Sequence, residues 1–122
     1  MASPKIALYY DAFQVDRYLS SEPEIGSFTA SPNPVTAGRS TTLTASNTTD
    51  GNPNSTITQV TFYYFDSSGN KVTLGTGTQT SPGVWTLSFT VNLASGSYTL
   101  FAQAEDNYGV FGNPFASTLQ VS

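Results

Sequence analysis

Residues 84–91, VWTLSFTV, show the clearest pattern in the chain. Trp85, Leu87, Phe89 and Val91 alternate with threonine and serine, so in an extended chain the large apolar side chains share one face and the hydroxyls share the other. Such alternation is typical of an antiparallel strand that packs one face on a core and turns the other toward water. The segment therefore predicts a half-buried strand.

The same alternation continues on both sides of this segment. Two further strong strands are predicted, with inward-facing side chains at Val60, Phe62 and Tyr64 and at Tyr98, Leu100, Ala102 and Ala104. Weaker strands are predicted near residues 28–30, 40–46, 71–76 and 119–121. Turn formers such as Ser81-Pro82-Gly83 separate the strands, and no segment of helical period is long enough to connect parallel strands. We therefore predict an all-β antiparallel sandwich or small barrel.

The composition argues against several classes of function. The 122 residues contain no His and no Cys, which removes the usual ligands of zinc, haem and iron–sulfur centres and the usual Cys or Ser–His nucleophile pairs. Eight acidic against four basic side chains leave no basic surface for nucleic acid, and no apolar run is long enough for membrane insertion. The carboxylates are scattered, without a recognisable general acid–base pair. We therefore expect a single domain that needs no cofactor and is not an enzyme.

Carboxylates near the predicted strand ends fit a metal site poorly. Calcium takes six to eight oxygen ligands, whereas the loop from Asp66 to Asn70 supplies one carboxylate. Glu105, Asp106 and Asn107 are better interpreted as a turn in which Asx side chains bond to their own backbone. We therefore expect no metal site.

Two segments carry a resemblance to a known family. Residues 24–46, EIGSFTASPNPVTAGRSTTLTAS, and residues 93–109, LASGSYTLFAQAEDNYG, resemble bacterial immunoglobulin-like domains of cell-surface and adhesion proteins. The resemblance covers residues 23–122 and implies an immunoglobulin-like antiparallel β-sandwich of about seven strands. It also implies that the SPNPV step lets the first strand cross between sheets and that Tyr98 forms a tyrosine corner. The location implied is extracellular or at a bacterial cell surface.

Residues 1–22 lie outside this resemblance, yet they are too apolar for a solvated linker. We predict an extra N-terminal strand with an interaction face made of Ile6, Leu8, Tyr10, Phe13 and Val15. It has three alternative positions: on the edge of its own sandwich, on a neighbouring copy, or as the tail of a preceding repeat. Pairing with a neighbour is donor-strand complementation. Such contacts are head-to-tail and produce filaments, so the main hypothesis is a structural subunit whose principal partner is itself.

The second hypothesis is a carbohydrate-binding or adhesion module of a larger bacterial surface protein. The alternation places Tyr63, Phe65 and Phe101 on an outer sheet face, where exposed rings suit either sugar stacking or a subunit interface. Covalent glycosylation is a separate possibility. Two Asn-X-Ser/Thr sequons, at Asn47 and Asn54, lie in a loop rich in turn formers. Plain turn residues are the alternative interpretation of both sequons.

Overall fold

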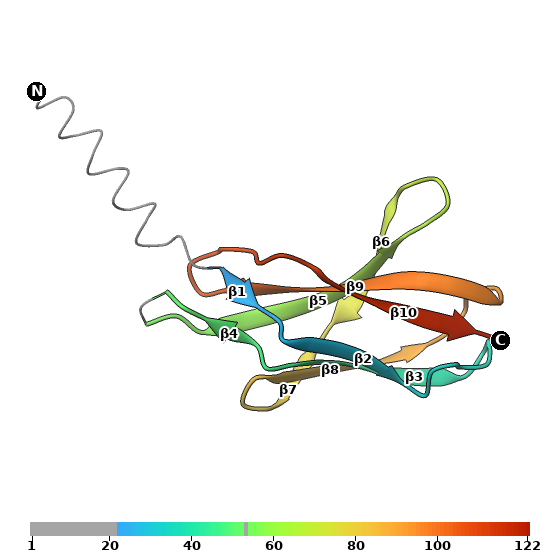
Figure 1. The fold of residues 1–122 in the computed structure, drawn as a ribbon, viewed down its shortest axis with the longest axis horizontal. Helices are drawn as coiled ribbons and strands as arrows, with labels where there is room; N and C mark the ends of the chain where they lie inside the picture. Colours follow the sequence, from blue (N-terminus) through green and yellow to red (C-terminus); the bar gives the residue numbers. More distant parts are fainter. Residues whose placement is uncertain (1–21, 53) are drawn as a thin grey trace, which may run out of the picture.

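A computed structural model describes residues 22–52 and 54–122, and these residues form a sandwich of two antiparallel sheets (Figure 1). One sheet has the order β2-β3-β8-β7, built from β2 (Ser27–Ser31), β3 (Ser40–Ser46), β8 (Val84–Thr90) and β7 (Thr78–Ser81). The other has the order β10-β9-β5-β6, built from β10 (Phe115–Val121), β9 (Gly96–Asp106), β5 (Ile57–Phe65) and β6 (Lys71–Thr76). A short pair, β1 (Pro23–Glu24) with β4 (Thr49–Asp50), lies at one end. The predicted all-β antiparallel sandwich is confirmed.

The strand order matches that of immunoglobulin sandwiches, in which sheet A-B-E-D faces sheet G-F-C, here with one strand added beside the third. The predicted crossing of the first strand also occurs. After β2 pairs with β3, Val35 forms a parallel bridge to Val121 of the opposite sheet, and its N–H donates to the Gln120 carbonyl at 2.9 Å. The SPNPV segment therefore connects the two sheets.

Turn residues end the strands for identifiable reasons. Pro82 and Gly83 occupy the centre of the β7–β8 hairpin, and Gly83 adopts a φ of 74°, which a residue without Cβ reaches at little cost. In the β5–β6 hairpin, the Asp66 carboxylate accepts the N–H groups of Ser68 and Asn70, both at 2.9 Å. Both turns were predicted from the sequence.

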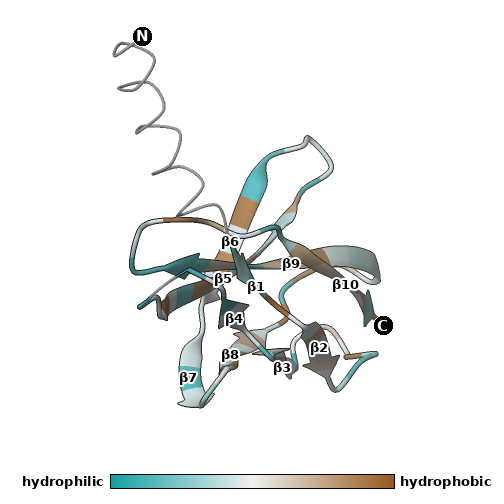
Figure 2. Ribbon diagram, turned by 60° about the vertical axis from the view of Figure 1, so that its left-hand side comes forward, coloured by the Kyte–Doolittle hydropathy of each residue, from teal (hydrophilic) through white to brown (hydrophobic). Residues whose placement is uncertain are grey.

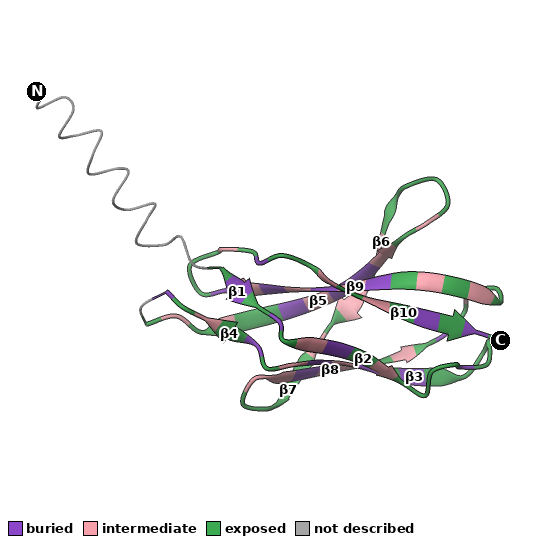
Figure 3. Ribbon diagram, viewed as in Figure 1, coloured by how far each residue is buried: buried purple, intermediate pink, exposed green. Residues whose placement is uncertain are grey.

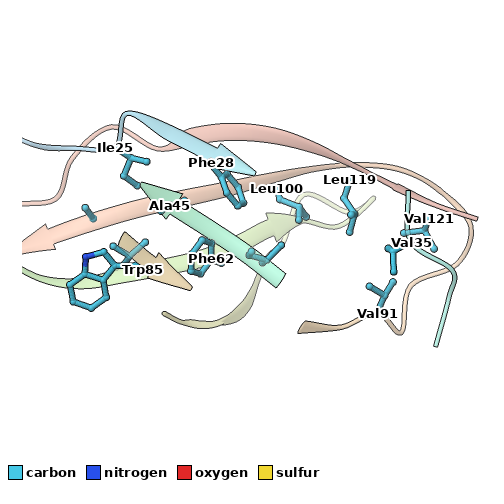
Figure 4. Close-up of a cluster of buried hydrophobic side chains, with 14 residues drawn as sticks. Ile25, Phe28, Val35, Ala45, Phe62, Trp85, Val91, Leu100, Leu119 and Val121 are labelled. Atoms are coloured by element: carbon cyan, nitrogen blue, oxygen red, sulfur yellow. The ribbon is translucent and has the colours of Figure 1, made fainter. Parts of the chain in front are cut away.

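The core lies between the sheets and takes the inward side chains of both (Figures 3 and 4). Apolar and polar residues follow one another along several strands, whereas β7 is hydrophilic throughout (Figure 2). Trp85 is buried, and the ring of Phe28 contacts the ring of Phe62 with centroids 5.4 Å apart. Burying a side chain of this size contributes about 1.5–3 kcal/mol. Apolar burial across the sandwich is therefore the main source of its stability.

Strand β7 and the β1–β4 pair were missed by the sequence analysis. The predicted N-terminal strand cannot be compared with the structure. Strand β7 is exposed at every residue and carries no apolar alternation, so it gives no signal. The β1–β4 pair is only two residues long on each side. The predicted N-terminal strand, with Ile6, Leu8, Tyr10, Phe13 and Val15, lies outside the described residues. None of the described segments contains a helix that could cross a membrane.

Candidate functional site

An aromatic cluster, made of Tyr63, Phe65 and Phe101, lies on the outer face of the β10-β9-β5-β6 sheet. We define the outer face as the side of this sheet that points away from the other sheet. Tyr63 of β5 is directly opposite Phe101 of β9, and their rings stack with centroids 5.4 Å apart and an interplanar angle of 21°. Phe65 meets both rings edge-on, with centroids 5.7 Å from each. The sequence therefore placed the three residues on the correct face.

Their exposure differs from the prediction, which left all three rings open to solvent. Tyr63 is only 5% exposed, so its expected role as an exposed sugar-stacking ring is wrong. The reason is tertiary: Phe101 is stacked on its ring, and the Lys71 ammonium lies 4.3 Å from its centroid as a cation–π contact. Burial also raises the pKa of the Tyr63 hydroxyl. Phe65 remains 50% exposed and is the most exposed ring of the cluster.

Polar side chains border the aromatic cluster. Thr73 lies opposite Tyr63 on β6, and Thr61 lies opposite Gln103 on β9. The Gln103 amide donates to the Gly112 carbonyl at 2.9 Å, which holds this side chain in place. The outer face therefore combines an apolar ring surface with hydroxyl and amide groups, a composition that suits a polyhydroxylated ligand.

The sequons lie in turns at one end of the sandwich. Asn47 and Asn54 are both exposed and adopt left-handed conformations, with φ of 54° and 55°. Asparagine tolerates this region better than most residues, so a turn role accounts for both. Glycosylation at either position stays a prediction.

Tyr98 makes the hydrogen bond that characterises a tyrosine corner. Its hydroxyl donates to the Ala94 carbonyl at 2.6 Å, four residues upstream. Its ring also meets Tyr64 edge-on, with centroids 6.0 Å apart. Tyr98 therefore fixes the entry into β9, which carries Phe101.

A pair of carboxyl groups, made of the buried Asp106 and the half-buried Asp50, was missed by the sequence analysis. Asp106 and Asp50 share a hydrogen bond, and the Asn52 amide donates to Asp106 at 3.3 Å. The sequence correctly suggested a turn here, since Asp106 bonds to its own downstream backbone. The sequence contains no indication that Asp50 is the partner of Asp106, because the two residues are far apart in the chain. No group of three or more His, Cys, Asp or Glu side chains able to hold a metal occurs within residues 22–52 and 54–122.

Comparisons with solved structures support the β-sandwich fold, and a carbohydrate-binding module is among the similar structures. No protein-family model matches the chain, and no curated protein matches it significantly, so membership of the bacterial immunoglobulin-like family stays a prediction. Among solved structures, the chain is similar to carbohydrate-binding modules of the β-sandwich superfamily described as promiscuous in specificity. That match has a TM-score of 0.59 and 25% identity and covers 83% of this chain. The chain spans about a third of that structure, 34%.

The fold is also similar to superoxide reductase (neelaredoxin) from Ignicoccus hospitalis, with a TM-score of 0.59 and 16% identity over 82% of each chain. This finding corrects the expectation that the protein is not an enzyme. The expectation took the absence of His and Cys and the scattered carboxylates as grounds to exclude catalysis, whereas a protein of similar fold is an enzyme. At this identity the similarity concerns the fold alone.

Proposed function

We propose that this chain is a carbohydrate-binding module whose ligand contacts the outer face of the β10-β9-β5-β6 sheet. The observation that carries the proposal is the half-exposed ring of Phe65, held edge-on against the stacked pair Tyr63 and Phe101. Because these two rings are packed behind it, Phe65 cannot rotate away freely, and a preorganised ring loses little entropy on binding. The similarity to carbohydrate-binding modules supports the same class of ligand.

The charges of this face favour a neutral glycan. Along the four strands of the sheet, the register places Lys71 and Glu105 on the outer face, and the other outward residues there are uncharged. The two charges are opposite in sign and sit at different ends of the face. A polyanionic glycan would meet little net positive charge here, in a chain with a net charge of −4. As part of this proposal, the protein is located outside a bacterial cell or at its surface.

The test is retention of the purified chain by a panel of polysaccharides in affinity gel electrophoresis. We expect retardation by at least one of soluble β-glucan, xylan, mannan or glycol chitin. Phe65→Ala should weaken that binding about tenfold, since an aromatic contact contributes about 0.5–1.5 kcal/mol beyond its buried area. The matched control is Thr42→Ala, which removes an exposed side chain from the other sheet.

A subunit interface on the same face is the competing explanation. It predicts that no glycan retards the chain and that light scattering shows a dimer or larger species which Phe65→Ala converts to monomer. That pair of results would overturn the proposed function. A monomer that is retarded by glycan would support it.

A further inference from the structure

Phe111 belongs to the same face, as the strand register shows. It forms an isolated antiparallel bridge with Glu105, and directly opposite residues of an antiparallel pair point to the same side. Glu105 shares its side of β9 with Gln103 and Phe101, because side chains alternate along a strand. Two backbone bonds fix this register, from Gly112 N–H to the Ala104 carbonyl at 2.9 Å and from Asp106 N–H to the Val110 carbonyl at 3.1 Å.

Phe111 is also the most exposed of the large hydrophobic side chains on this part of the chain, at 56%. It lies at the level of Glu105, four residues along β9 from Phe101, which corresponds to about 13 Å at the usual rise of a strand. The distance to Phe65 is greater still, since Phe65 lies beyond Tyr63, the partner of Phe101. A single pyranose ring cannot contact both aromatic positions.

The surface between these two aromatic positions is polar and uncharged. Gln103 and Thr61 occupy it, and Gln59 donates its amide to the Thr61 hydroxyl at 3.1 Å. The Gln103 amide is held by the Gly112 carbonyl, in the same segment that carries Phe111. Hydroxyl and amide groups between two aromatic contacts suit a sugar chain, because each sugar unit presents an apolar ring face for stacking and hydroxyl groups for hydrogen bonds.

We propose that Phe111 is a second aromatic contact of the glycan-binding face and that the ligand is an internal stretch of an extended, neutral polysaccharide lying along β9. This inference rests on the proposed function. The inference extends the proposed function in two respects. The ligand runs from Phe65 to Phe111, and it is recognised over several sugar units rather than at a chain end. Affinity should therefore increase with ligand length until both rings are covered, since each added contact shares one cost of association.

The experiment is calorimetric titration of the full chain with gluco-, xylo-, manno- and N-acetylglucosamine oligosaccharides of two to six units. For the series that binds, we expect the hexasaccharide to bind at least tenfold more tightly than the disaccharide. Phe111→Ala should weaken the hexasaccharide about tenfold and leave the disaccharide unchanged, whereas Phe65→Ala should weaken both. Thr42→Ala is the control, and thermal melting of each variant checks the fold.

Failure of this inference differs from failure of the proposed function. Equal affinity for the disaccharide and the hexasaccharide, or a hexasaccharide affinity that Phe111→Ala leaves unchanged, would overturn the extended-ligand proposal while glycan binding stands. Absence of binding to every oligosaccharide and every polysaccharide would overturn both.

Discussion

The carboxyl group of Asp50 on β4 shares a hydrogen bond with the carboxylate of Asp106 at the end of β9. Burial raises the pKa of Asp50, and the bond to Asp106 raises it further. Burial alone would also raise the pKa of Asp106, but hydrogen bonds from Asp50 and from the N–H groups of Val110 and Tyr108 outweigh it and lower the pKa. Asp50 is therefore the member of the pair that keeps its proton to higher pH, and the pair joins the β1–β4 end of the sandwich to β9.

The first prediction concerns the pH dependence of stability. Because the pKa of Asp50 is raised in the fold, its contribution is present at low pH and is lost as the pH rises through the raised value. The pKa of Asp106 is lowered, so its contribution is present above the ordinary carboxyl range and is lost as the pH falls through the lowered value. We expect Asp50→Asn, which keeps a donor without a titrating proton, to reduce the loss of melting temperature toward neutral pH.

This effect is measured by circular dichroism melts of both proteins from about pH 3 to pH 8. Glu24→Gln is the matched control, because Glu24 is an exposed carboxylate on β1, the strand that pairs with β4. The control should follow the profile of the unsubstituted protein. If the profile of Asp50→Asn is also parallel to that of the unsubstituted protein, the raised pKa of Asp50 is contradicted.

A second prediction follows from the close approach of Gly112 to β1. A Cβ at this position would lie 1.7 Å from the carbonyl oxygen of Pro23, a backbone atom that cannot move alone. Gly112→Ala should therefore displace β1 and cost about 1–3 kcal/mol of unfolding free energy. For a domain of this size, each kcal/mol lowers the melting temperature by about 4–8 °C. Asn113→Ala, at the exposed neighbour, should melt within about 2 °C of the unsubstituted protein, as surface substitutions usually do.

The sequence predicted those features of the fold that depend on local patterns. Alternation within residues 84–91 was sufficient to predict β8 with Trp85 buried, because the period of a strand is a local property. The alternation of Val60, Phe62 and Tyr64 was likewise sufficient to place Tyr63 on the outer face. It could not predict the exposure of Tyr63, since that depends on Phe101 and Lys71 from two other strands.

The same limit explains what was missed in the candidate site. Phe111 lies in a turn-rich segment without alternation, and only its bridge to Glu105 shows which face it shares. Asp50 gave no signal because its partner Asp106 is distant in the chain and only the tertiary fold brings the two side chains together. Local composition specifies the strands, whereas register across strands determines which side chains meet.

A third prediction tests the hydrogen bond of Tyr98. Tyr98→Phe removes the hydroxyl that donates to the Ala94 carbonyl at 2.6 Å but keeps the ring against Tyr64. We expect a loss of about 0.5–1.5 kcal/mol, the usual net value of one such bond. Urea denaturation followed by Trp85 fluorescence measures it, and the slope of the transition should not change. A midpoint equal to that of the unsubstituted protein would show that the bond contributes nothing to stability.

The last prediction tests the proposed boundary between residues 1–22 and 23–122. The buried hydrophobic core described for the sandwich runs from Ile25 to Val121 and is filled from both sheets. A chain lacking residues 1–21 should therefore fold and melt within about 3 °C of the full chain, because no described core contact is removed. If residues 1–21 instead pair with a sheet of the same chain, deleting their apolar side chains should lower the melting temperature by much more than about 3 °C. Light scattering on both chains also tests the predicted self-assembly: a full chain that is larger than a monomer, with a truncated chain that is monomeric and folded, is the result that an exchanged strand requires.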